Sequence, residues 1–211
     1  MKKNNYKAIL FDLDGVLVNM PDGHYEALNR ALSLFGTSIE REEHYRLFNG
    51  LPTRKKIEAL EKQGRLPTGL REFINEVKQK HTKEIIPKYC PPDYSKIILL
   101  KQLQGKNLKL ACCSNSIKET LHLMLKSSQL FEYFDFIIGN DEVENPKPHP
   151  EIFLKTFKAL KVKPEECIIV EDAPYGIAAA KASGAKVYEV RGVEDVNLEL
   201  FDEILEIEDR K

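Results

Sequence analysis

Short runs of consecutive apolar residues recur along the chain and alternate with longer stretches in which apolar residues follow a helical spacing. Continuous apolar runs are typical of strands that are buried on both faces, and the helical spacing is typical of amphipathic helices. The pattern therefore predicts an α/β fold, with a parallel sheet covered by helices on both faces. The predicted strands are Tyr6–Phe11, Leu108–Cys113, Phe134–Ile138, Cys167–Val170 and Lys186–Val190, and the predicted helices are Ser116–Ser128, Pro150–Lys161 and Tyr175–Ser183.

Three of the predicted helix ends have local signals. Ser116 followed by Glu119 matches a capping box, in which the two residues satisfy backbone groups at a helix start. Pro150 suits a first helical turn, and Gly184 suits a helix stop. These positions predict where the helices begin and end.

The segment from Pro21 to Cys90 departs from the alternation of strands and helices, because it contains no good strand. Its apolar residues follow helical stripes, one of which is closed by Gly36. Such stripes indicate a packed helical core. We therefore predict an all-helical insertion at residues 19–90, a Rossmann-like core formed by residues 1–18 and 91–211, and a return hinge at the proline-rich stretch PKYCPPDY.

Composition narrows the possible partners. The 211 residues carry a formal net charge of -1, so no basic excess indicates nucleic acid. No segment has the roughly 18–20 apolar residues that a membrane-spanning helix needs, and the N-terminus does not match a signal peptide. The four cysteines have no CxxC spacing and three lie in apolar runs, which indicates buried thiols. We expect a cytoplasmic protein, monomeric or weakly dimeric, without nucleic-acid or membrane partners.

Polar side chains follow several of the predicted strands. In a parallel sheet, ligands collect at the carboxyl ends of the strands, where neighbouring connections diverge. If the first strand lies between the second and the fourth, these groups converge on one crevice. They are Asp12 and Asp14 in ILFDLDGVLV, Ser114 and Asn115 in LACCSNS, Lys147 in NPKPHPE, and Glu171 and Asp172 in IIVEDAPYG.

Four carboxylates in one crevice would repel one another and raise some of their pKa values. A divalent cation, with Lys147 nearby, removes this problem. Oxygen ligands without accompanying histidine or cysteine favour Mg²⁺ over zinc. The sequence therefore predicts a magnesium site.

The same groups suit phosphoryl transfer. One carboxylate can attack phosphorus to form an aspartyl-phosphate, and a second can protonate the leaving alcohol and later deprotonate water. Ser114 and Asn115 can donate hydrogen bonds to phosphoryl oxygens, and Lys147 can neutralise their charge. Taken singly, each residue also fits a turn, a helix cap or an ordinary surface position, so the prediction depends on the whole set.

The sequence resembles the haloacid-dehalogenase-like phosphotransferase superfamily over most of the predicted core. DLDGVLV resembles its first motif, SN the second, the lysine of NPKPHPE the third, and VEDAPYGIAAAKASGA the fourth. The helical insertion resembles the superfamily's small helical cap. The resemblance implies that Asp12 is the nucleophile, Asp14 the acid and base, and Ser114 a phosphate ligand. It also implies that Lys147 orients phosphate and nucleophile, and that Mg²⁺ is held by Asp12, the backbone carbonyl of Asp14, Asp172 and, directly or through water, Glu171.

Residues of the insertion are candidates for substrate contact. By the same resemblance, His24 occupies a position that often faces substrate, although it also fits an ordinary residue at a helix start. FNGLPTRKK resembles a substrate-specificity loop, so Arg54 and Lys55 either meet the distal part of the substrate or form a solvated basic face. Lys78 and Lys80 are predicted to lie at the surface.

One departure from the pattern concerns the residues after the first motif. Related phosphatases and mutases commonly have an acidic residue followed by Ser or Thr, whereas this chain has Asn19 and Met20. Met20 cannot donate a hydrogen bond to the acid/base carboxyl. The nucleophile is retained, but the hinge behaviour is open.

The combined prediction is a Mg²⁺-dependent phosphomonoesterase for a small phosphorylated metabolite, with a sugar phosphate as the expected substrate. A phosphomutase resembling β-phosphoglucomutase is an alternative that uses the same side chains. A binding module that keeps the fold without turnover is a second alternative. Dehalogenation is disfavoured, because the dehalogenases that the chain resembles lack the second aspartate and the acidic pair.

Overall fold

The computed structural model describes residues 6–48 and 50–207. The outer ends of the predicted core, 1–5 and 208–211, and Asn49 of the predicted specificity loop lie outside the described residues. Five parallel strands form one sheet in the order β3-β2-β1-β4-β5. The strands are β1 (Ala8–Phe11), β2 (Lys109–Cys113), β3 (Phe136–Ile138), β4 (Cys167–Glu171) and β5 (Lys186–Glu189).

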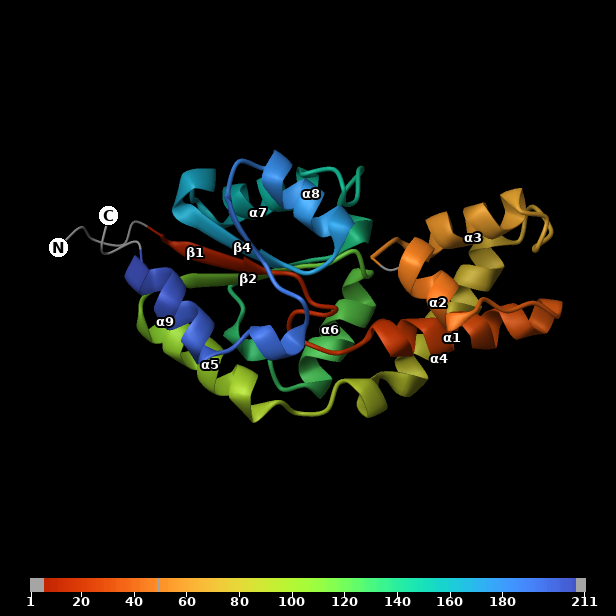
Figure 1. Cartoon of the computed structure of the whole chain (residues 1–211), viewed down its shortest axis with the longest axis horizontal. Coiled ribbons are helices and arrows are strands. Elements are labelled where there is room, and N and C mark those ends of the chain that lie inside the picture. Colours follow the sequence, from red (N-terminus) through yellow and green to blue (C-terminus); the bar gives the residue numbers. More distant parts are fainter. Residues whose placement is uncertain (1–5, 49, 208–211) are drawn as a thin grey trace.

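Helices cover both faces of this sheet, as the pattern predicted (Figure 1). On one face lie α5 (Tyr94–Gly105), α6 (Lys118–Ser127) and α9 (Leu198–Ile207), and on the other lie α7 (Glu151–Leu160) and α8 (Pro174–Ala182). The predicted α/β class and Rossmann-like arrangement are confirmed.

Strand β1 contributes side chains to the hydrophobic cores on both faces of the sheet. Ile9 and Phe11 pack into the cluster that includes α5, α6 and α9, whereas Ala8 and Leu10 pack into the cluster that includes α7 and α8. All four side chains are fully buried, because successive residues of a strand point to opposite faces. The central strand is therefore apolar throughout, and its first polar residue comes only where the strand ends.

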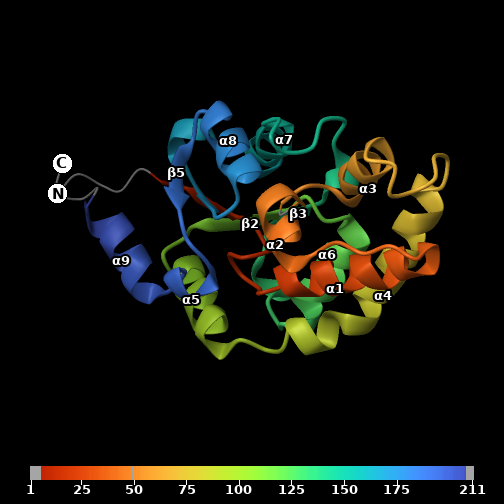
Figure 2. The same ribbon diagram turned by 45° about the vertical axis from the view of Figure 1, so that its right-hand side comes forward.

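A lobe of helices stands beside the carboxyl edge of the sheet (Figure 2). It contains α1 (Pro21–Leu32), α2 (Arg41–Glu43), α3 (Thr53–Lys62) and α4 (Arg71–Tyr89), which lie between β1 and α5 along the chain. Its apolar side chains form a cluster separate from the two beside the sheet. This cluster supports a cap, although the division at residues 19–90 stays a prediction. The buried members are Leu28, Ala31, Leu32, Ile39, Phe48, Ile57, Leu60, Leu66 and Ile74.

The predicted capping box at the start of α6 is wrong. The residue before the helix is Ile117, whose side chain makes no cap, and the backbone N–H of Lys118 in the first turn donates instead to Asp141 Oδ1 at 2.8 Å. Ser116 instead donates a hydrogen bond from Oγ to Asp14 Oδ2 at 3.2 Å. Its hydroxyl therefore belongs to the crevice at the end of β1. The predicted stop at Gly184 is consistent with a left-handed backbone there, at φ +83°.

The predicted hinge is shorter than the proline-rich stretch. Pro87 lies inside α4, which continues to Tyr89. The connection to the core is therefore limited to residues 90–93, and Asp93 caps α5 by accepting hydrogen bonds from the backbone of Ser95 and Lys96. The four cysteines of the chain are free and buried. Within the described chain, none of the helices combines the length and apolarity that a bilayer crossing requires.

A buried histidine lies in the core of the helical lobe. His44 begins a π-helical turn, His44–Phe48, and its side chain is fully buried. Among the described residues, neither ring nitrogen has a hydrogen-bond partner, and the Tyr25 ring lies 5.4 Å away between centroids. Burial, together with the nearby Lys56 ammonium, lowers the pKa of His44 to about 3. The ring is therefore neutral in the folded protein.

We expect His44 to make the fold sensitive to acid. The unfolded chain binds a proton at this ring below a pH of about 6.5, whereas the native protein binds it only near the pKa of about 3. Stability is therefore lost as the pH falls through this window, by about 2 kcal/mol at a pH of about 5. Denaturant unfolding of wild type and His44→Leu at neutral pH and at a pH of about 5 measures this, and equal pH dependence of the two proteins contradicts it.

Candidate active site

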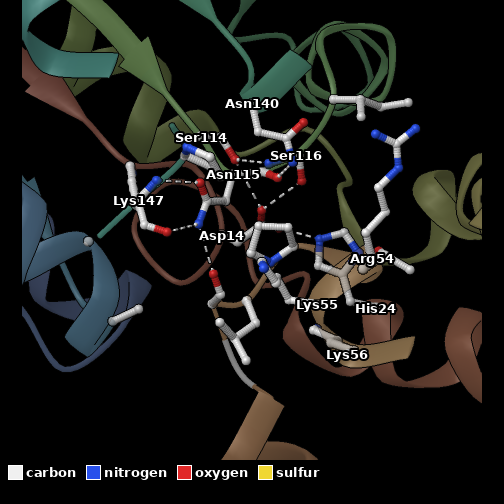
Figure 3. Close-up of a pocket in the computed structure, with 18 of the residues that line it drawn as sticks. Asp14, His24, Arg54, Lys55, Lys56, Ser114, Asn115, Ser116, Asn140 and Lys147 are labelled. Carbon is white, nitrogen blue, oxygen red and sulfur yellow. Dashed lines mark hydrogen bonds and ion pairs between the residues drawn. The ribbon is translucent and has the colours of Figure 1, made fainter. Parts of the chain in front are cut away.

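The sheet order brings the predicted groups together. Strand β1 lies between β2 and β4, so the residues after these three strands meet at one edge of the sheet. A cavity of about 470 Å³ opens there, between the core and the helical lobe. Figure 3 shows side chains from both parts around it, with Asp14, Ser114, Asn115 and Lys147 on the core side and His24 and Lys56 from the lobe.

Asp12 is the first residue after β1. Its backbone N–H still donates to Val170 of β4 at 3.0 Å, which fixes the position of the side chain. The residue is only 7% exposed, and Asp12 Oδ1 accepts a hydrogen bond from Lys147 Nζ at 2.7 Å. Burial raises the pKa of Asp12 above its ordinary value, although the ammonium of Lys147 works in the opposite direction. The carboxylate is thus held in place by a buried positive charge.

Lys147 has a full set of acceptors inside the protein. Its Nζ donates to Asp12, to the backbone carbonyl of Cys113 at 2.7 Å, and to Glu171 Oε1. Burial alone would lower its pKa, but Asp12 and Glu171 outweigh that effect and raise it. The predicted lysine is therefore a charged group that joins the ends of β1, β2 and β4.

Glu171 and Asp172 provide oxygen atoms without partners. Glu171 Oε2 and Asp172 Oδ1 are buried and accept no hydrogen bond within the described residues. Burial and the nearby Asp12 raise the pKa of Glu171 to about 8 and that of Asp172 to about 7. Such carboxyls lose their protons readily only when a cation offsets their charge.

These oxygens fit a divalent cation. One carboxylate oxygen from each of Asp12, Glu171 and Asp172 lies within 4.8 Å of the others. An all-oxygen donor set of this kind suits Mg²⁺. The Asp14 carboxylate does not belong to this group, and the ligand role predicted for its backbone carbonyl stays a prediction.

Asp14 has a different set of neighbours from Asp12. It accepts hydrogen bonds from Ser116 Oγ at 3.2 Å and, weakly, from Ser114 Oγ at 3.5 Å, and His24 Nε2 lies 3.0 Å from Asp14 Oδ1 (Figure 3). Burial alone would raise the pKa of Asp14, but the His24 ring and the Lys78 ammonium lower it overall. Met20 cannot donate a hydrogen bond to Asp14, and in this structure the donors to that carboxyl are Ser116 and His24.

Lys78 was predicted to lie at the surface, and that prediction is wrong. The residue is 6% exposed, and its Nζ lies 3.3 Å from His24 Nδ1. A charged lysine can only donate to this nitrogen, so Nε2 of the ring carries the proton and donates to Asp14. Lys78 follows Ile74 by four residues on the buried face of α4, and this spacing was the available signal. Lys80 is exposed, as predicted.

The basic residues at the start of α3 differ in exposure. Arg54 and Lys55 lie at the rim of the cavity, where both are exposed and paired with glutamates, Arg54 with Glu72 at 2.8 Å and Lys55 with Glu58 at 3.4 Å. Lys56 lines the same cavity but is 6% exposed. The substrate role predicted for Arg54 stays a prediction, and the inward position of Lys56 was not foreseen.

Asn115 joins the core to the lobe. Its Nδ2 donates to the backbone carbonyl of Gly50 at 3.0 Å, and its Oδ1 accepts from the backbone N–H of Lys147 at 3.2 Å. This amide therefore links the loop before α3 to the lysine loop across the cavity. The predicted contact of Asn115 with substrate stays a prediction.

Two glycines leave room for the acidic pair. Gly15 has a backbone φ of +89°, and a Cβ there would lie 2.1 Å from Asp172 Oδ2. A Cβ at Gly176 of α8 would lie 2.2 Å from the Glu171 carboxylate. Since side chains have no space at either position, the glycines allow the backbone to approach both carboxylates.

Comparison with known proteins agrees with this geometry. The chain belongs to the haloacid dehalogenase-like hydrolase family, whose model matches residues 9–190. It is 33% identical over 180 residues to the phosphoglycolate phosphatase of Aquifex aeolicus, covering 85% of this chain and 82% of that protein. It is 29% identical over 178 residues to a phosphorylated carbohydrates phosphatase of Thermotoga maritima, covering 84% and 82%. The fold is similar to that of β-phosphoglucomutase from Clostridium difficile, with a TM-score of 0.82 at 24% identity over 98% of this chain and 100% of that one.

We expect Gly15→Ala to lose the binding of Mg²⁺, because the new methyl group would displace the Asp172 carboxylate. Gly36→Ala is the matched control, since Gly36 also has a positive φ, of +65°, but faces open space. Mg²⁺ at about ten times its Kd stabilises a protein that binds it by about 1.4 kcal/mol. Unfolding with and without Mg²⁺ should show this gain for wild type and Gly36→Ala only. An equal gain in Gly15→Ala would exclude the proposed geometry.

Proposed function

We propose that the protein is a Mg²⁺-dependent phosphomonoesterase that acts on a small phosphorylated metabolite, such as a sugar phosphate, through an aspartyl-phosphate. One observation carries the proposal. Two aspartates separated by one residue face different surroundings: Asp12 faces Lys147 and the acidic pair, whereas Asp14 faces His24 and Ser116. This separation gives the two carboxyls different roles.

In the first step, a carboxylate oxygen of Asp12 attacks phosphorus, and the bond from phosphorus to the alcohol oxygen breaks. Lys147 holds Asp12 in position and offsets negative charge on the phosphoryl group. Ser114, whose contact with Asp14 is long at 3.5 Å, can donate to a phosphoryl oxygen instead. When bound by Asp12, Glu171 and Asp172, Mg²⁺ would further reduce the repulsion between the carboxylate and the phosphoryl oxygens.

Asp14 moves the protons. The negative charge of a bound phosphate raises the pKa of a neighbouring carboxyl, so Asp14 can carry the proton that the departing alkoxide needs. After the alcohol leaves, the ionised Asp14 accepts a proton from water as the water attacks the aspartyl-phosphate. His24 and Ser116 keep the carboxyl oriented toward the cavity in both steps. Water then carries the phosphoryl group away as inorganic phosphate, and Asp12 is regenerated.

The named relatives support the reaction class. The Aquifex aeolicus and Thermotoga maritima proteins are named as phosphatases for phosphoglycolate and for phosphorylated carbohydrates. The cavity between core and lobe suits a small metabolite, which a closed lobe would shield from bulk water. We also propose a cytoplasmic location and a monomeric or weakly dimeric state, with no nucleic-acid or membrane partner.

We expect Asp12→Asn to reduce phosphate release from a panel of sugar phosphates by at least about 10³-fold, because the amide is not a nucleophile. Asp202→Asn is the control, since Asp202 is exposed on α9, and its activity should equal that of wild type. Normal turnover by Asp12→Asn would refute the mechanism. Incubation of wild type with β-glucose 1-phosphate and a bisphosphate primer distinguishes the alternatives: free phosphate indicates hydrolysis, and glucose 6-phosphate indicates a mutase.

Removal of divalent cations should abolish activity and leave the fold intact. Asp12, Glu171 and Asp172 hold their positions through β1, β4 and Lys147, so the metal is not needed to bring them together. Dialysis against a chelator should therefore stop phosphate release without changing the circular dichroism spectrum, and Mg²⁺ should restore the rate. Full activity in the presence of excess chelator would show that the acidic cluster does not work through a metal.

A further inference from the structure

Lys56 is a buried lysine whose side chain points toward the cavity from the helical lobe. It lies in the first half of α3, is 6% exposed, and lines the cavity that also contains Asp12 and Asp14 (Figure 3). Its neighbours on the same helix, Arg54 and Lys55, are exposed and paired with glutamates. Lys56 is therefore the member of this basic run that lines the cavity while buried and not paired with a glutamate.

Lys56 also differs from the other buried lysines that the structure describes. Lys147 donates to three acceptors, Lys96 donates to the carbonyls of Val193 and Val196 at 2.7 Å, and Lys78 contacts His24. No hydrogen bond or ion pair of the Lys56 ammonium is found within the described residues. An ammonium that is largely shielded from water and has no protein partner is costly, and an anion in the cavity would reduce that cost.

The charges around Lys56 are not balanced by the protein. Lys56 interacts electrostatically with Lys78, His24 and His44, which carry no negative charge, and with one carboxylate, Asp14. Asp14 already interacts with His24 and Ser116. Burial, followed by the repulsion from Lys78, lowers the pKa of Lys56 to about 7. The lobe side of the cavity therefore has an excess of positive charge.

This excess is separate from the charge that binds the transferred phosphoryl group. Lys147 is neutralised by Asp12 and Glu171, and these three residues form the end of the cavity where phosphorus is attacked. Lys56 and Lys78 instead lie on the lobe side and interact electrostatically with the Asp14 carboxyl, which meets the leaving alcohol in the proposed mechanism. In that mechanism the alcohol part of the substrate lies on the same side of the cavity as Lys56.

We propose that Lys56, together with Lys78, binds a second anionic group on the alcohol part of the substrate, so that the enzyme selects phosphomonoesters that also carry a carboxylate or a second phosphate. The inference rests on the proposed phosphatase function and specifies its substrate class. Either oxyanion would accept hydrogen bonds from the ammonium of Lys56 and offset the positive charge of the two lysines that Asp14 does not balance. A sugar phosphate without a second anionic group would offer Lys56 only hydroxyl groups as partners.

Matched pairs of substrates test the proposal. Phosphoglycolate is compared with 2-hydroxyethyl phosphate, and fructose 1,6-bisphosphate with fructose 6-phosphate, so that each pair differs mainly in the second anion. In at least one pair, we expect wild type to have a higher kcat/KM for the member that carries the second anionic group than for its partner, by about 10- to 100-fold. This comparison needs no variant, and the two pairs distinguish a carboxylate from a phosphate.

Variants then assign the preference to Lys56. Lys56→Met should lower kcat/KM for the preferred substrate, which carries the second anionic group, by about 10- to 100-fold. The kcat/KM for its matched partner should change by less than about 3-fold. Lys56→Arg, which keeps the charge, should retain most of the preference. Lys62→Met is the control on the same helix, because Lys62 is exposed and lies outside the cavity lining, and it should match wild type.

Two failures have different meanings. A wild-type enzyme that hydrolyses both members of each pair equally, or a Lys56→Met enzyme that loses both equally, overturns this inference and leaves the phosphatase proposal intact. A wild-type enzyme that hydrolyses no phosphomonoester in the presence of Mg²⁺ overturns the proposed function itself. Melting temperatures of the variants separate lost binding from lost folding.

Discussion

The site depends on one buried ammonium group. Lys147 Nζ contacts Asp12 and Glu171, and without it the ends of β1 and β4 would place two buried carboxylates side by side with no compensating charge. Removing one member of such a group leaves uncompensated buried charge, which costs about 3–5 kcal/mol. The contact also aligns three strands, because the same ammonium donates to the carbonyl of Cys113 at the end of β2. One interaction therefore serves both the fold and the chemistry.

The same arrangement leaves one oxygen of Glu171 and one of Asp172 free to bind a cation. Lys147 satisfies one oxygen of Glu171, whereas the other oxygen and Oδ1 of Asp172 are buried without a partner among the residues that the structure describes. Gly15 and Gly176 have no side chains that would fill the space around these groups. The acidic pair is thus left open to a cation, whereas Asp14 is turned toward His24 and the lobe. A short sequence of three residues, Asp12 to Asp14, supplies carboxyls to two different environments.

The core could be predicted largely because its signals are local. Apolar runs mark strands whatever they pack against, and the polar groups after β1, β2 and β4 meet because parallel strands end at the same edge. The helical lobe was harder to predict, because the face that a helix buries depends on the elements that pack against it. Lys78 and Lys56 lie on buried faces of α4 and α3, although lysines are usually exposed. Ser116 matched a capping box in the sequence, and only its distance to Asp14 shows that its hydroxyl belongs to the site.

The central claim is that Asp12 receives the phosphoryl group, and rapid-quench labelling tests it most directly. Wild type is mixed with Mg²⁺ and a substrate whose phosphoryl group is radioactive, quenched in acid within one turnover, and digested into peptides. The account predicts transient label on the peptide that contains Asp12, as an acyl phosphate that hydroxylamine releases. Full turnover without covalently bound label, or label on a different residue, would contradict it.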